Sequence, residues 1–328
     1  MPDFSIGSPT IWNDTFEENY FFDGPNPVSD GEHLFSVSGY NTKMYVWKSI
    51  PNESGAKPDI VYNFRFLPLV FEPNDITLHN STFAVVGTNS LILIWNSLPL
   101  NGELPDVVVD LYNYTHDRVT IGGVFIDDNY MYVWANCWLY IWNGTPTKPR
   151  HPDLQIFMPE SISRIFSDGK HLITSTRDRK VVIFNVSDII NASIPFEAPL
   201  EEEGKKEKEE ESPEPEDTEE PPEDQASTEN LPKIVLSMYM GNEPLLAPQE
   251  VFSDGEHLFV VDLELSLVLI WSEFPTEDDQ LPDVVIGKGR HMNTRDGLFW
   301  PQTVWFDGHY LWIGEVKFSG RLLRFSVG

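Results

Sequence analysis

Four side chains with oxygen donors stand near the starts of short apolar runs, and together they could hold a metal ion. They are Asn26, Asn74, Asp75 and Glu250. Carboxylate and amide oxygens are the ligands that calcium prefers. Their spacing does not itself require a metal, so two alternatives stay open: no cofactor, or a calcium-like ion that would support metal-dependent hydrolysis.

Other catalytic signatures are absent from the sequence. It has no phosphate-binding glycine loop, no GxSxG nucleophile elbow and no HExxH zinc motif. Four histidines, His33, His171, His257 and His309, recur beside an Asp-Gly or similar turn, which indicates a structural role. The single cysteine, Cys137, has no evident base partner in the sequence. A non-enzymatic protein is favoured.

A second set of residues could bind a partner rather than do chemistry. These residues are basic or aromatic and occupy segments between apolar runs, and Lys288 to Trp300 is the longest such segment. The set is Arg65, Phe66, His116, Arg118, Arg177, Arg179, Lys288, Arg290, His291, Arg295 and Trp300. Arginine beside aromatic side chains is typical of binding surfaces. A protein or an anionic ligand is the expected partner.

These residues need a scaffold, and an internal repeat predicts one. An apolar run that ends in an aromatic residue recurs six times, at Trp47, Trp95, Trp142, Phe184, Trp271 and Phe325. The intervals are 48, 47, 42, 87 and 54 residues, and the longest contains an insert. A turn precedes each run, as in Asp30-Gly31 and Asp168-Gly169, and is expected to be a type I′ hairpin. Proline-aspartate and a further apolar run follow most copies, as at Pro105-Asp106.

Each copy therefore holds four short strands, A to D from the axis outward, and six copies predict an all-β, six-bladed β-propeller. The B–C and D–A loops share one face, here called the loop face. The A–B turns and C–D connections share the other, the turn face. The partner-binding set falls on the loop face, and the repeated aromatics are expected to pack between blades.

The two ends of the sequence predict how the ring closes. The sixth copy ends after its third strand, whereas the chain begins with Pro2-Asp3-Phe4-Ser5-Ile6-Gly7. That opening matches Pro282-Asp283-Val284-Val285-Ile286-Gly287, the fourth strand of the fifth copy. The N-terminal strand is therefore expected to complete the last blade, which would remove an exposed edge.

These repeats resemble those of NHL-type propellers. The resemblance rests on Pro282 to Gly287, on Pro301 ahead of Asp307-Gly308, and on Leu93-Ile94-Trp95-Asn96-Ser97-Leu98-Pro99, which is similar to a bacterial and archaeal variant. It covers nearly the whole chain and implies a platform for protein or RNA. Propellers of the gluconolactonase type hold an axial metal on first-strand Glu, Asn and Asp, which implies a lactonase-like alternative.

The long interval contains a strongly acidic insert. Residues 197–230 are expected to be a disordered loop in the C–D connection of the fourth blade, within a single domain of residues 1–328. From Glu201 to Glu229 there are 15 acidic residues against three lysines. Such a segment cannot bury enough apolar surface to offset its ordering entropy.

Charge and composition limit the partners. The formal net charge of -30 disfavours nucleic acid, and no apolar run is long enough to predict a membrane span. Localisation stays open: sequons suggest the cell surface, and the lack of a recognisable signal peptide suggests the cytoplasm. The sequons are at Asn13, Asn52, Asn80, Asn113, Asn143, Asn185 and Asn191.

Overall fold

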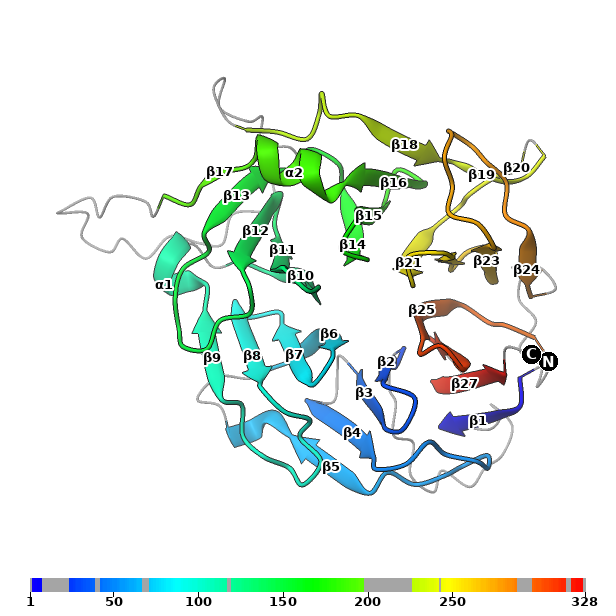
Figure 1. The fold of residues 1–328 in the computed structure, drawn as a ribbon. Helices are drawn as coiled ribbons and strands as arrows, with labels where there is room; N and C mark the ends of the chain where they lie inside the picture. Colours follow the sequence, from blue (N-terminus) through cyan, green and yellow to red (C-terminus); the bar gives the residue numbers. More distant parts are fainter. Residues whose placement is uncertain are drawn as a thin grey trace, which may run out of the picture.

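Six small antiparallel sheets stand in a ring around a central axis (Figure 1). A computed structural model describes residues 2–7, 24–38, 42–66, 71–116, 119–197, 226–241, 243–287, 297–316 and 320–326. The predicted six-bladed β-propeller is confirmed. Within the described ranges, no helix has the length and apolar character needed to span a bilayer.

Each blade has four strands, and the first strand lies innermost. Blade one comprises β2 (Asn26–Ser29), β3 (Leu34–Ser38), β4 (Lys43–Trp47) and β5 (Ile60–Asn63). Blade two comprises β6 (Pro73–His79), β7 (Thr82–Gly87), β8 (Leu91–Trp95) and β9 (Val107–Asp110). Blade three comprises β10 (Ile121–Ile126), β11 (Tyr130–Ala135), β12 (Trp138–Asn143) and β13 (Leu154–Phe157), with β17 (Ile194–Pro195) added outside β13.

The second half of the ring repeats the pattern. Blade four comprises β14 (Ile162–Ser167), β15 (His171–Thr176), β16 (Lys180–Asn185) and β18 (Lys233–Leu236). Blade five comprises β21 (Pro248–Ser253), β22 (Leu258–Asp262), β23 (Leu267–Trp271) and β24 (Val284–Ile286). Blade six comprises β25 (Pro301–Phe306), β26 (Tyr310–Glu315), β27 (Arg321–Ser326) and β1 (Phe4–Gly7).

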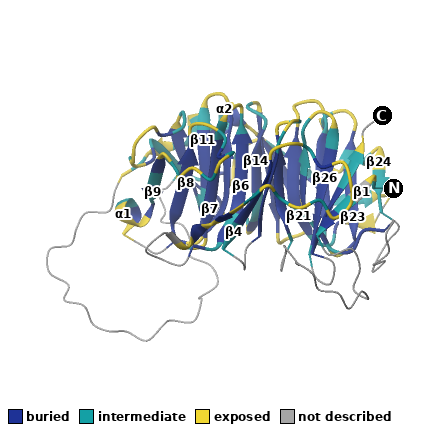
Figure 2. Ribbon diagram, turned by 90° about the horizontal axis from the view of Figure 1, so that it is seen from below, coloured by how far each residue is buried: buried dark blue, intermediate teal, exposed yellow. Residues whose placement is uncertain are grey.

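Short elements decorate the connections between these strands. They are η2 (Phe64–Phe66), α1 (Tyr112–Thr115), α2 (Val186–Ala192), β19 (Met238–Met240) and β20 (Glu243–Pro244). Helix α1 lies in a D–A loop and α2 in a C–D connection, so they mark the loop face and the turn face. Figure 2 shows these two helices toward opposite faces of the ring.

The repeated tryptophans are buried and also polar partners, which explains the recurrence of the motif. The Trp95 indole N–H donates to the Glu103 carbonyl at 2.8 Å, and the Asp106 carboxylate accepts the Asn96 N–H at 2.7 Å. The equivalent pairs recur around Trp47, Trp142 and Trp271. Each tryptophan thus fills the core and fixes its own C–D connection, as buried aromatic N–H groups usually find an acceptor.

The Asp-Gly turns are four-residue loops rather than the expected two-residue type I′ hairpins. In blade four, Ser167 pairs with Leu172 across the loop, and the Asp168 carboxylate accepts the N–H groups of Lys170 and His171. Gly169 has φ of 85°, a conformation that favours glycine. The His171 ring contacts the same aspartate at 3.0 Å. His33 and His257 repeat this arrangement, which confirms a structural role, whereas His309 stands one position earlier in its turn.

The ring closes as the sequence predicts. Strand β1 pairs antiparallel with β27, so the two described ends lie side by side in Figure 1. Ile6 faces Leu322 and is fully buried. The Asp3 N–H donates to the Arg324 carbonyl at 2.8 Å, and the Asp3 carboxylate accepts the Ser326 hydroxyl at 2.7 Å. The N-terminal strand is therefore the outer strand of blade six.

The acidic insert begins where it was expected, between the third and fourth strands of blade four. Residues 198–225 lie outside the described residues. Residues 226–230 are described, and the expectation that they belong to a disordered loop is wrong. Ser227 bridges to Phe157, and Thr228 is fully buried, with its N–H donating to the Phe157 carbonyl at 3.0 Å. This stretch is ordered because the edge of β13 satisfies its backbone groups.

Candidate functional site

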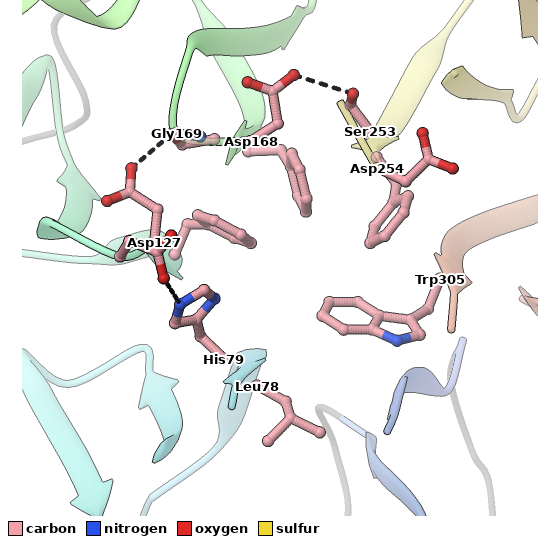
Figure 3. Close-up of a pocket in the computed structure, with 13 residues that line it drawn as sticks. Leu78, His79, Asp127, Asp168, Gly169, Ser253, Asp254 and Trp305 are labelled. Carbon is pink, nitrogen blue, oxygen red and sulfur yellow. Dashed lines mark hydrogen bonds and ion pairs between the residues drawn. The ribbon is translucent and has the colours of Figure 1, made fainter. Parts of the chain in front are cut away.

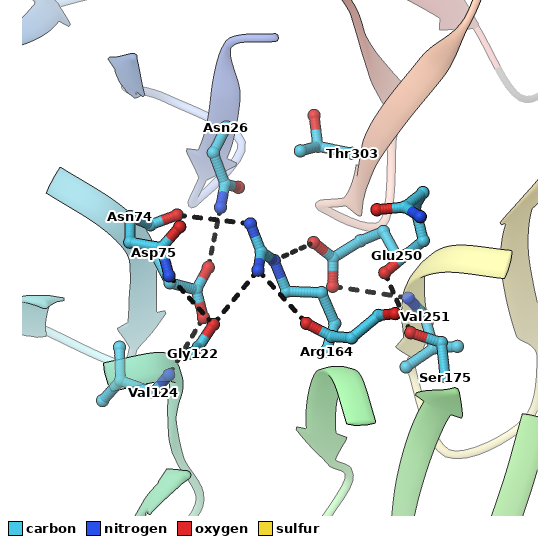
Figure 4. Close-up of polar contacts among 12 residues, drawn as sticks. Asn26, Asn74, Asp75, Gly122, Val124, Arg164, Ser175, Glu250, Val251 and Thr303 are labelled. Carbon is cyan, nitrogen blue, oxygen red and sulfur yellow. Dashed lines mark hydrogen bonds and ion pairs between the residues drawn. The ribbon is translucent and has the colours of Figure 1, made fainter. Parts of the chain in front are cut away.

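One position of the innermost strand faces the axis in every blade. A β-bulge just before this position in five of the strands sets its register. The six residues at this position are Asn26, Asp75, Gly123, Arg164, Glu250 and Thr303. They form a polar layer across the ring (Figure 4). Three of the four predicted metal ligands, Asn26, Asp75 and Glu250, are thus brought together.

Arg164 occupies the centre of this layer. Its guanidinium donates to the carbonyls of Gly122 at 3.1 Å and Asn74 at 3.4 Å. Its Nε lies 3.5 Å from Oε2 of Glu250. Figure 4 shows the guanidinium between Asp75 and Glu250. The protein therefore supplies its own cation to the axial carboxylates.

Asp75 is almost fully buried and is satisfied by neighbouring blades. One carboxylate oxygen accepts the Asn26 amide N–H at 2.7 Å, and the other accepts the Val124 N–H at 2.9 Å. Gly123 makes room for this contact, because a Cβ there would lie 3.2 Å from Oδ2 of Asp75. Burial raises the pKa of Asp75, whereas Arg164 and these hydrogen bonds lower it.

Glu250 is the less satisfied of the two axial carboxylates. Its Oε2 accepts no hydrogen bond among the described residues, although the Arg164 guanidinium is near. Burial raises the pKa of Glu250 to about 8; the negative charge of Asp75 adds to the rise, and Arg164 opposes it. The neutral, protonated form is thus stabilised in the folded protein.

This layer does not fit a calcium-like ion. The Arg164 guanidinium lies among the carboxylates, and both oxygens of Asp75 already accept hydrogen bonds. The amide of the fourth predicted ligand, Asn74, donates to the carbonyls of Ile121 and Gly122. Among the described residues, no group of three or more His, Cys, Asp or Glu side chains is placed to hold a metal ion. A metal would have to displace the arginine, so the geometry disfavours the metal-dependent alternative.

Arg164 is not among the candidate site residues that the sequence suggested. The bulge between Ile162 and Arg164 shifts the register by one residue, and such a slip exchanges the two faces of a strand. Counting back four positions from Asp168 in the turn, rather than forward from the strand start, would have found it.

A second axial layer, two positions along each strand toward the turn face, is largely aromatic. It comprises Val28, Thr77, Phe125, Phe166, Phe252 and Trp305. Beyond it, a cavity of about 220 Å³ opens at the turn face, lined by these aromatics and by the A–B turns of blades two to five (Figure 3). No residue of this cavity was among the predicted site residues.

The predicted partner-binding residues of the loop face are only partly described. Arg65, Arg177 and Arg179 are exposed, as is His116, which caps α1 in a left-handed conformation. Trp300 is half-buried, and the backbone of Phe66 lies in η2. Arg118, Lys288, Arg290, His291 and Arg295 lie outside the described residues, as does the side chain of Phe66.

Several other residues of these loops belong to the core instead. Phe64 and Phe71 are buried, and their rings pack against each other at 4.9 Å. Arg321 is buried in an ion pair with Glu315 and donates to the Gly297 carbonyl at 3.1 Å. Glu315 also accepts the Phe299 N–H at 2.7 Å, which anchors the loop ahead of β25. These side chains hold the loops and are not available to a partner.

Comparisons with known proteins identify no family for this chain. No protein-family model matches the sequence, and no curated protein matches it. Many solved structures are similar to it. One is the computationally designed Ika8 protein, at 7% identity and a TM-score of 0.46, with 99% of each chain covered. The NHL-type resemblance therefore stays a prediction.

Proposed function

We propose that this protein is a non-enzymatic binding scaffold that engages an acidic protein, or another anionic ligand, through its loop face. The observation that carries this proposal is the exposure of three arginines that form no ion pair with a described residue. Arg65, Arg177 and Arg179 are exposed, and none of them forms an ion pair with a described residue. The chain has 52 acidic residues against 22 basic ones, and these exposed arginines keep positive charge available to an anionic partner.

The scaffold also suits this role. Arg177 and Arg179 stand on the short loop between the paired strands β15 and β16 of blade four, and Arg65 lies in η2, between blades one and two. Short loops on a rigid framework keep their positions. Arg179 sits in a tight turn with φ of 65°, and its N–H donates to the Thr176 carbonyl at 3.2 Å. Such preorganisation lowers the entropy lost on binding.

The test uses a fluorescent poly-glutamate peptide, titrated with the full chain at low ionic strength. Combining Arg65→Ala, Arg177→Ala and Arg179→Ala should weaken binding by about tenfold and reduce its salt dependence. The matched control combines Lys48→Ala, Lys148→Ala and Lys170→Ala, three exposed lysines of the turn face. Equal losses in the two triple variants, or no binding of the peptide at all, would refute the loop-face assignment.

A further inference from the structure

The cavity on the turn face has an aromatic floor built from four consecutive blades. The rings of Phe125, Phe166, Phe252 and Trp305 follow one another with centroid separations of 4.1, 4.7 and 5.0 Å. The Trp305 indole N–H donates to the Ser29 carbonyl at 2.8 Å, which fixes the orientation of its ring. Figure 3 shows Trp305 and Leu78 projecting into the cavity. An arc of ring faces and edges is thus presented at the mouth of the axis.

The wall above this floor carries carboxylates in two different states. Asp127 accepts the Ser167 hydroxyl at 2.8 Å, and Asp168 accepts the Ser253 hydroxyl at 3.0 Å, so both take part in contacts between blades. Asp254 lacks such a contact, because blade six has Phe306 where the serine would stand. The side chain of Asp128 is 82% exposed. Both are contacted by a histidine ring instead of a serine hydroxyl, Asp128 by His79 at 2.9 Å and Asp254 by His257 at 2.8 Å, and both line the cavity at its rim.

The surroundings of the rim are also acidic. The A–B turns of the six blades carry five exposed carboxylates against one exposed lysine, Lys170. The carboxylates are Asp30, Glu32, Asp128, Asp254 and Glu256. A low-dielectric cavity within a ring of like charges concentrates the field at its mouth. This field attracts cations and repels anions.

We propose that this cavity receives one lysine or arginine side chain from a basic segment of a partner protein. The aromatic rings attract a cation through their faces and pack against its carbon stem, and Asp128 and Asp254 supply the opposite charge. At about 220 Å³ the cavity is below the roughly 300 Å³ at which sites for larger ligands begin, so one side chain suits it.

The probe that tests this is a labelled oligo-lysine peptide, followed by fluorescence anisotropy with the full chain. The lining variant combines Asp128→Asn and Asp254→Asn, which keep the shape of both side chains. We expect it to weaken binding by about tenfold. The control combines Glu32→Gln and Glu256→Gln, which remove the same charge from the same face but do not line the cavity. The control should change affinity by less than about twofold.

A second measurement separates a cavity from diffuse attraction. Choline chloride should displace the peptide at concentrations where sodium chloride does not, because its methyl groups pack on aromatic rings. Phe252→Leu, with its melting temperature checked, should reduce this difference between the salts. Equal loss in the lining and control variants would overturn the proposal, as would choline binding without peptide binding. The probe is cationic and the face is the opposite one, so failure here leaves the loop-face proposal standing.

Discussion

Glu250 sits beside an arginine and still holds its proton more firmly than an ordinary glutamate. The axial layer contains one half-buried cation, Arg164, and two buried carboxylates, Asp75 and Glu250. Ionising both carboxylates would leave net negative charge away from water, which is costly. Asp75 has two hydrogen-bond donors, whereas Glu250 Oε2 accepts no hydrogen bond among the described residues, so Glu250 is the better place for the proton.

This arrangement predicts how stability changes with pH. Between the ordinary glutamate pKa of 4.5 and the folded value of about 8, the folded protein holds a proton that the unfolded chain has released. The free energy of unfolding therefore falls as pH rises through this window. Glu250→Gln cannot release a proton, so it should remove this fall, which is about 4 kcal/mol between about pH 5 and about pH 9. Urea titrations of both proteins at about pH 5 and about pH 9 measure it. Equal pH dependence in the two proteins would show that Glu250 is ionised in the fold.

At the scale of elements, the blades are joined by hydroxyl–carboxylate contacts as well as by their apolar faces. A serine at the end of a first strand donates to the turn aspartate of the preceding blade. The three pairs are Ser29 with Asp307, Ser167 with Asp127, and Ser253 with Asp168. The same aspartates close their own turns, so each contact fixes the register of two neighbouring blades.

Ser253→Ala should therefore cost more stability than its size suggests. The Asp168 carboxylate is largely buried. Burial raises its pKa, but His171 and backbone N–H groups outweigh this effect and hold the pKa low. Ser253→Ala would remove one of the donors to this carboxylate. We expect a loss of about 1 kcal/mol in the free energy of unfolding. Ser272→Ala, an exposed serine of the same blade, is the control and should cost almost nothing. If the two variants unfold at the same urea concentration, the contact does not contribute to stability.

The sequence predicted the elements well because the repeated residues make repeated contacts. In four blades, the tryptophan and the aspartate of the following Pro-Asp form hydrogen bonds within the same C–D connection. Their spacing in the sequence therefore marks each of these blades. The axial layer was harder, because each bulge displaces one residue without changing the apolar pattern around it. In blade two the equivalent of the turn aspartate is His79, which left Asn80-Ser81 as the only visible turn signal. Arg164 and the turn-face cavity could be recognised only once the six strands were aligned in space.

At the scale of the whole molecule, the ring has two chemically different ends. Exposed arginines stand on the loop face, and carboxylates surround an aromatic cavity on the turn face. Between them, the Arg164 layer and the aromatic layer fill the axis, and two cavities lined by described residues of these layers measure about 40 and 20 Å³. The two proposed sites are therefore separated by a filled axis and can be tested one at a time.

Both faces depend on the ring being closed, and β1 is the strand that closes it. Ile6 is fully buried, whereas Val284, in the equivalent strand β24, is 45% exposed. Ile6→Ala should cost about 2–4 kcal/mol in the free energy of unfolding, and the control Val284→Ala less than about 0.5 kcal/mol.

Deleting residues 2–7 should go further, because it also leaves the β27 edge unpaired and open to association with other chains. Calorimetry measures the loss of stability, and light scattering measures the association of chains. If Ile6→Ala were no more costly than Val284→Ala, β1 would lie outside the cooperative unit; a single transition at lower temperature would show that closing one blade stabilises all six.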